Sequence, residues 1–65
     1  MMYAFESDGM RYELSIVSIE TDGKNTIIYD GCSKFVFSGS YMQEYSLMNN
    51  VKIGKRQKVS YHGME

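Results

Sequence analysis

The stretch "MRYELSIVSIETDG", Met10–Gly23, contains an abrupt change in the placement of its apolar side chains. Side chains of a β-strand alternate between the two faces of a sheet. Up to Ile16 the apolar residues occupy even-numbered positions, but at Val17 and Ile19 they occupy odd-numbered ones. Such a change requires a β-bulge or a sharp bend near Ile16 and Val17, or a middle buried on both faces. It favours a strand that turns the corner of a small barrel, and it predicts that Leu14 and Val17 are both buried.

Tight-turn dipeptides divide the rest of the chain into short segments. Asp-Gly pairs, which tolerate the positive φ angles of hairpin turns, occur at residues 8–9, 22–23 and 30–31. Gly39-Ser40, Asn49-Asn50 and Gly54-Lys55 separate the remaining runs. The expected strands are 2–6, 10–20, 24–29, 33–38, 41–48, 51–53 and 57–62. Turns this closely spaced leave no room for crossover helices. The pattern therefore predicts one all-β domain over residues 1–65, a small antiparallel meander curled into a barrel-like sheet.

Residues 41–48 also fit a helix. Ser40 and Gln43 are spaced as a capping box, and Tyr41, Tyr45 and Met48 lie at helical spacing. The same segment alternates in the manner of a strand and is followed by an Asn-Asn turn, so we expect a strand. The alternative is an OB- or SH3-like barrel with a short helix near 41–48.

At 65 residues the chain is near the lower size limit for a fold held by one hydrophobic core. Cys32 is the only cysteine, which excludes an intrachain disulfide, and Cys32 with His62 cannot supply four zinc ligands. We expect neither a metal nor a cofactor. Tight packing or self-association must provide the stability, and a homodimer is one expectation. The lone cysteine and the absence of a signal-like or membrane-spanning run indicate a cytoplasmic protein without a membrane partner.

Candidate catalytic residues are few. His62 follows Ser60 by two positions, but no nucleophile-elbow motif surrounds that serine. Cys32 follows an Asp-Gly turn and lies far in sequence from the only histidine. We therefore expect a protein without enzymatic activity and interpret His62 as a surface residue near the end of the chain.

The stretch "VKIGKRQKVSYHG", Val51–Gly63, holds four of the seven basic residues. Its pattern predicts a hairpin with Lys55 and Arg56 at the tip and with an inner face of Val51, Ile53, Val59 and Tyr61. Lys52, Lys58 and His62 have the opposite parity and are expected outside. Among the aromatic residues, Tyr41 and Tyr45 are the ones expected to be exposed. The candidate binding residues are Lys52, Lys55, Arg56, Lys58, Tyr41, Tyr45 and His62.

Charge is unevenly distributed along the chain. Residues 1–30 carry six acidic and two basic side chains, and residues 31–65 carry five basic and two acidic ones. The net charge of −1 lacks the basic excess of a typical DNA-binding protein. The charge asymmetry and the many tyrosines and methionines favour a protein-binding module, such as a phage or mobile-element inhibitor or regulator of a host protein.

The alternative function is a small β-barrel that binds single-stranded nucleic acid through the basic hairpin 51–62, with bases stacked on aromatic rings and lysines on phosphates. Protein binding is the preferred hypothesis because Phe35, Phe37 and Tyr61 alternate with the inward-facing residues. Their rings are therefore expected in the core, where they cannot stack on bases.

Overall fold

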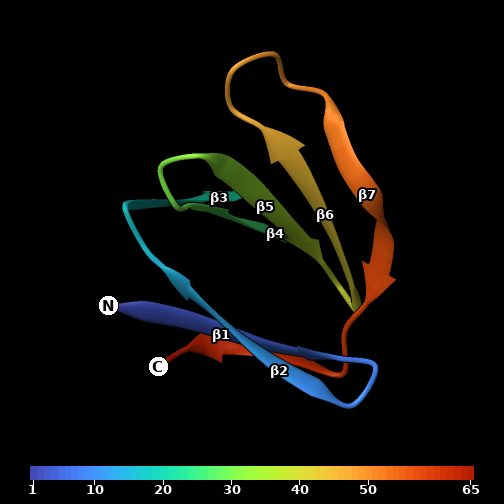
Figure 1. Ribbon diagram of the computed structural model, residues 1–65. Coiled ribbons are helices and arrows are strands. Elements are labelled where there is room, and N and C mark those ends of the chain that lie inside the picture. Colours follow the sequence, from blue (N-terminus) through green and yellow to red (C-terminus); the bar gives the residue numbers. More distant parts are fainter.

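The computed structural model covers residues 1–65. The chain forms eight β-strands in two antiparallel sheets and contains no helix (Figure 1). The strand orders are β2-β1-β8 and β3-β4-β5-β6-β7. The structure contains no helix that is long and apolar enough to cross a membrane. The strands are β1 Met2–Ser7, β2 Met10–Ser15, β3 Ser18–Asp22, β4 Asn25–Tyr29, β5 Ser33–Ser38, β6 Tyr41–Ser46, β7 Lys52–Lys58 and β8 Tyr61–Met64.

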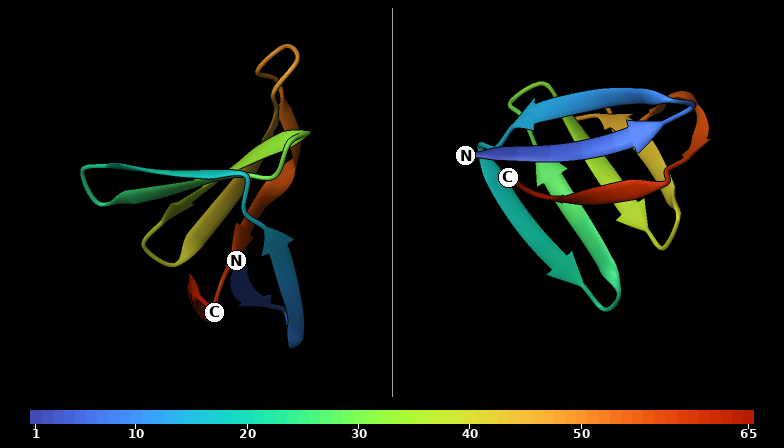
Figure 2. Two further views of the ribbon diagram at one scale, coloured as in Figure 1. Left: turned by 90° about the vertical axis from the view of Figure 1, so that its left-hand side faces the viewer. Right: turned by 90° about the horizontal axis from the view of Figure 1, so that it is seen from below.

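The predicted all-β, antiparallel class is confirmed, and so is a strand within 41–48, where the alternative helix is absent. The strand pairings form two separate sheets, so a barrel-like closure stays a prediction. The chain passes between the sheets twice, through 16–17 and through 59–60, as the views in Figure 2 show.

The phase change in the opening stretch marks the first of these crossings. The run expected as one strand over 10–20 is divided into β2 and β3, which belong to different sheets. Leu14 and Ile16 pack against the core, but Val17 is 70% exposed. The predicted burial of Val17 is wrong because this residue lies at the corner. Its backbone N–H donates to the Tyr29 carbonyl at 2.8 Å, and its side chain faces neither sheet interior.

The core lies between the two sheets and is centred on Phe37, whose side chain is fully buried. The ring centroid of Phe37 lies 5.0 Å from that of Tyr3 and 5.4 Å from that of Phe5, both on β1. Strand register brings the other members together, because Ile28 is paired with Phe35 and Phe37 with Met42. The buried hydrophobic cluster comprises Tyr3, Phe5, Ile28, Phe35, Phe37, Met42 and Val59.

The predicted C-terminal hairpin is wrong. β7 continues through Gly54 and Lys55 and pairs with β6, while β8 pairs with β1 in the other sheet. Gly54 is not in a turn but at a register shift in the β6–β7 ladder, where it adopts a φ of 71°. Glycine in a strand often marks a bulge of this kind. Of the expected inner face only Val59 is buried, whereas Val51, Ile53 and Tyr61 are exposed.

Gly54→Ala is expected to lower the free energy of unfolding by about 1–2 kcal/mol, because a left-handed backbone is unfavourable for a residue with a Cβ. Nothing lies within 4 Å of the position that this Cβ would occupy, so the cost is conformational and not steric. Gly54→Asn is the matched control. Asparagine tolerates a positive φ better than alanine does, so this variant is expected to lose less free energy of unfolding. Urea denaturation measures both variants, and equal losses would contradict this explanation.

Candidate binding face

The five-stranded sheet has one face on the core and an opposite face, here called the outer face, that is directed away from it. Directly paired residues of neighbouring strands share a face, so the register defines the outer face as three rows. One row is Glu20, Ile27, Val36 and Gln43; the next is Ser18, Tyr29, Lys34, Tyr45 and Lys52; the third is Asp22, Asn25, Ser38, Tyr41 and Lys58.

The centre of the outer face is apolar and aromatic. Ile27 and Val36 are paired with each other and remain partly accessible to solvent. Tyr29 and Tyr45 are also partly accessible, and Tyr41 is 39% exposed. This side of the sheet therefore offers aliphatic and tyrosine surface that is partly accessible to solvent.

Basic side chains gather at the β7 end of this face. Lys52 is paired with Tyr45 and Lys58 with Tyr41. The Arg56 guanidinium lies 4.1 Å from the centre of the Tyr41 ring. On the central strand β5, the Lys34 ammonium lies 5.3 Å from the centre of the Tyr45 ring. Both distances are within the range of cation–π attraction, which orients the cations over the rings.

Acidic side chains occupy the opposite, β3 end of the same face. Glu20 and Asp22 lie on β3, every residue of which is exposed. The Tyr29 hydroxyl donates a hydrogen bond to the Glu20 carboxylate. This hydrogen bond raises the pKa of Tyr29 and keeps the phenol protonated. The outer face therefore runs from an acidic rim, across a centre of aliphatic and tyrosine side chains that also contains Lys34, to a basic rim.

The structure brings six of the seven predicted binding residues together at the β6–β7 end of the sheet and separates His62 from them. His62 is partly buried, and its ring stacks on Phe37 at a centroid distance of 4.9 Å. Its Nε2 lies 3.1 Å from the Gly39 carbonyl oxygen, which can only accept, so Nε2 carries the proton. The Tyr3 hydroxyl then donates to Nδ1 at 2.6 Å. The interpretation of His62 as a surface residue beside the lysines is wrong, because β8 packs in the other sheet.

Sequence reasoning missed the contribution of β4 and β5 to this face. Ile27 and Tyr29 share one parity, but it is Ile28, of the opposite parity, that is fully buried. The segment "NTIIY" has apolar side chains of both parities. Only the pairing of Ile28 with Phe35 decides which set points inward.

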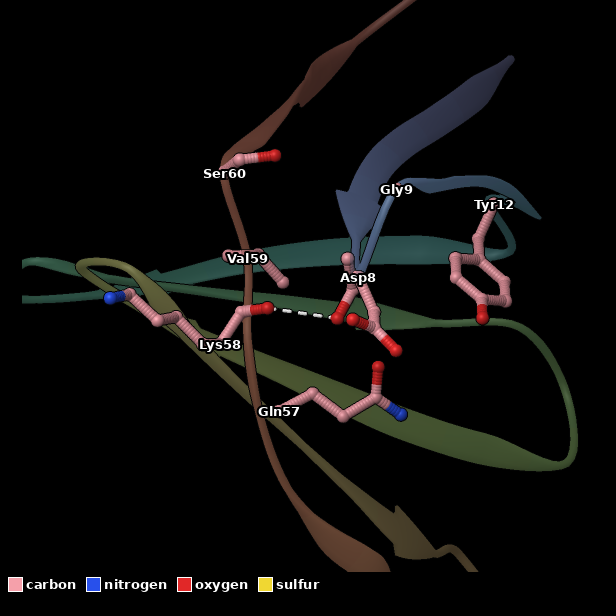
Figure 3. Close-up of a pocket in the computed structure, with 8 residues that line it drawn as sticks. Asp8, Gly9, Tyr12, Gln57, Lys58, Val59 and Ser60 are labelled. Carbon is pink, nitrogen blue, oxygen red and sulfur yellow. Dashed lines mark hydrogen bonds between the residues drawn. The ribbon is translucent and has the colours of Figure 1, made fainter.

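A hollow of about 640 Å³ lies between the β1–β2 turn and the segment that joins β7 to β8 (Figure 3). The Asp8 and Gln57 side chains point toward each other in it, whereas the Lys58 side chain extends away. The Ser7 hydroxyl donates to the Lys58 carbonyl at 2.8 Å and ties the two segments together. No group of three or more His, Cys, Asp or Glu side chains is placed to hold a metal ion.

Comparisons of the chain with protein-family models, with curated proteins and with solved structures find no match. The protein is a small all-β domain, and one side of its five-stranded sheet carries acidic, apolar, aromatic and basic side chains in order. Its function is therefore inferred from the chemistry of that surface.

Proposed function

We propose that the protein is a non-enzymatic binding module that docks on another protein through the outer face. The observation that carries this proposal is the order of the three zones, in which Ile27, Val36 and the tyrosines lie between a basic and an acidic rim. Protein interfaces have this composition, with few charges and many aromatic residues at the centre and polar groups at the rim. The form we propose is a small inhibitor or regulator, of the type that phages and mobile elements encode. Self-association stays a separate prediction.

The surroundings of His62 support the non-enzymatic part of the proposal. Both of its ring nitrogens are engaged, one by the Tyr3 hydroxyl and the other by the Gly39 carbonyl. The Ser60 hydroxyl is directed to the Glu6 carbonyl at 3.4 Å and not to the imidazole. A general base must reach the proton that it removes, so this arrangement favours a structural role for the histidine.

Single-stranded nucleic acid is the alternative ligand, and one observation favours it. Tyr41 and Tyr45 lie on the outer face beside basic residues, as stacking platforms do in proteins of that class. Two features favour protein. The Tyr41 and Tyr45 rings already face a cation of this chain. A nucleic-acid strand that crossed the sheet would bring its phosphates toward the carboxylates of Glu20 and Asp22.

The test is a comparison of two apolar-to-glutamate variants. Val36→Glu places a charge at the centre of the outer face, and Met10→Glu places one at an exposed apolar position in the other sheet. The tagged wild type is used to capture proteins from lysate with and without nuclease treatment. The captured proteins are identified, purified and titrated against all three forms. Val36→Glu is expected to weaken binding at least about 30-fold, the effect of removing a ~2 kcal/mol interface hot spot. Met10→Glu should bind as wild type.

Hydrogen exchange of the purified complex locates the interface. Protection of β4, β5 and β6 amides and unchanged exchange in β2 are expected. Two results would contradict the proposal: equal weakening by both variants, or co-purification of oligonucleotides whose removal by nuclease abolishes capture. The second would establish the alternative function.

A further inference from the structure

The register shift in the β6–β7 ladder creates a local distortion on the outer face. Met42 is paired with Gln57 and Glu44 with Ile53, so two steps along β6 correspond to four along β7. The intervening residues of β7, which are Gly54, Lys55 and Arg56, lie opposite Gln43 alone. The Gln43 amide nitrogen donates to the Gly54 carbonyl at 3.1 Å, which holds the widened strand in place.

Beside this distortion is a hollow of about 440 Å³ whose lining is basic. The side chains around it include three cations, from Lys52, Lys55 and Arg56, and no acid; the remaining lining residues are Gln43, Tyr45 and Gly54. The nearest acid in sequence on β6, Glu44, accepts a hydrogen bond from the Ser33 hydroxyl at 2.8 Å on the core side of the sheet. Every salt bridge in the structure is instead made by Arg11, far from this place.

Three unpaired cations around one hollow repel each other, and an anion placed among them would be attracted by all three. Basic residues on an edge strand also prevent aggregation, but that role requires neither a hollow nor a tyrosine within it. The Arg56 guanidinium lies over the Tyr41 ring, and a planar guanidinium can donate to two oxygens of one acidic group.

We infer that this hollow is a receptor for one glutamate side chain of the docking partner. The carboxylate lies between Lys55 and Arg56, and the methylene stem lies against Tyr45, the one aromatic ring in the lining. The inference rests on the proposed function, since the glutamate belongs to the protein that covers the outer face. A single glutamate on an otherwise neutral segment of the partner places no negative charge near the acidic rim. A chain of phosphates that crossed the sheet would be repelled there by Glu20 and Asp22.

The test is a nuclear magnetic resonance titration of the ¹⁵N-labelled protein with a short, otherwise neutral peptide that contains one central glutamate, acetylated and amidated so that this side-chain carboxylate is its only charge. Saturable shifts are expected at the Gly54 amide and at the Gln43 side-chain amide, and none with the peptide in which glutamine replaces the glutamate. The double variant Lys55→Gln/Arg56→Gln should bind at least about tenfold more weakly, a loss of ~1.4 kcal/mol. Lys24→Gln, at the exposed β3–β4 turn, should bind as wild type.

Titrations with inorganic phosphate and with oligothymidine identify the competing ligands. Tighter binding of either at Gly54 would overturn the assignment of a carboxylate. Absence of peptide-induced shifts, with the outer face still protected in the partner complex, would overturn this inference and leave the proposed function standing. Peptide-induced shifts at Gly54 with a partner that protects a different surface would instead contradict the proposed function.

Discussion

Phe37→Ala is expected to remove most of the stability of this protein. The Phe37 side chain is fully buried, and three rings lie within 5.4 Å of its centroid, those of Tyr3, Phe5 and His62. Truncation of a buried phenylalanine costs about 3–5 kcal/mol. A chain of this length has a total stability of only about 3–10 kcal/mol, at roughly 0.05–0.15 kcal/mol per residue. The variant should therefore be largely unfolded under conditions in which the wild type is folded.

Val36→Ala is the matched control for this prediction, because Val36 is the neighbouring residue on β5 and lies on the outer face. Its loss should remain below about 1.5 kcal/mol, since the side chain is only partly buried. Far-ultraviolet circular dichroism during urea denaturation measures both variants. Equal losses, or a larger loss at Val36, would show that the two faces of the sheet are wrongly assigned.

His62→Ala is expected to lower the free energy of unfolding by about 2–4 kcal/mol. The stack of the imidazole on Phe37 contributes ~0.5–1.5 kcal/mol as a ring pair. Its removal also leaves the Tyr3 hydroxyl without the Nδ1 acceptor, and an unsatisfied buried polar group costs ~1–3 kcal/mol. The bond from Nε2 to the Gly39 carbonyl, which ties β8 to the β5–β6 turn, is lost as well.

Lys58→Ala is the comparison variant that separates a structural role of His62 from a binding role. Lys58 is exposed on the outer face, and its truncation should change stability by less than about 0.5 kcal/mol. It should nevertheless slow association with the partner, because rim charges act mainly on the association rate. If His62→Ala instead left the stability unchanged and abolished binding, His62 would belong to the binding site after all.

The local chemistry of the chain was sufficient to predict the fold class and most strand boundaries. The Asp-Gly pair at 8–9 forms the β1–β2 turn, and both residues have the positive φ expected there. Near the second pair, Asp22 ends β3 and Gly23, with a φ of 62°, begins the β3–β4 turn. The phase change at 16–17 correctly located a corner. These features depend on the φ preferences and side-chain alternation of a few adjacent residues, which are present in the sequence itself.

The candidate binding face was only partly predictable. The basic residues of 52–58 and the exposure of Tyr41 were expected from composition and parity, and the structure places them together. Ile27 was not assigned to this face, because its segment has apolar side chains of both parities. The inward parity of Phe35 and Phe37 implies that Lys34 and Val36 point outward, but neither residue was proposed for binding. The exclusion of His62 depends on the pairing of β8 with β1, residues that lie at opposite ends of the chain.

Gly54 shows where sequence reasoning ends and tertiary structure decides. From sequence alone a glycine between short runs indicates a turn, and the turns predicted from Asp-Gly pairs are present. At Gly54 the same positive φ is accommodated within a strand, because β6 supplies a partner on one side and the Gln43 amide satisfies the displaced carbonyl. Turn preference is a property of the backbone at one or two residues. Whether that backbone reverses the chain or widens a strand is decided by hydrogen-bond partners distant in sequence, and so is the choice of which face of the strand is buried.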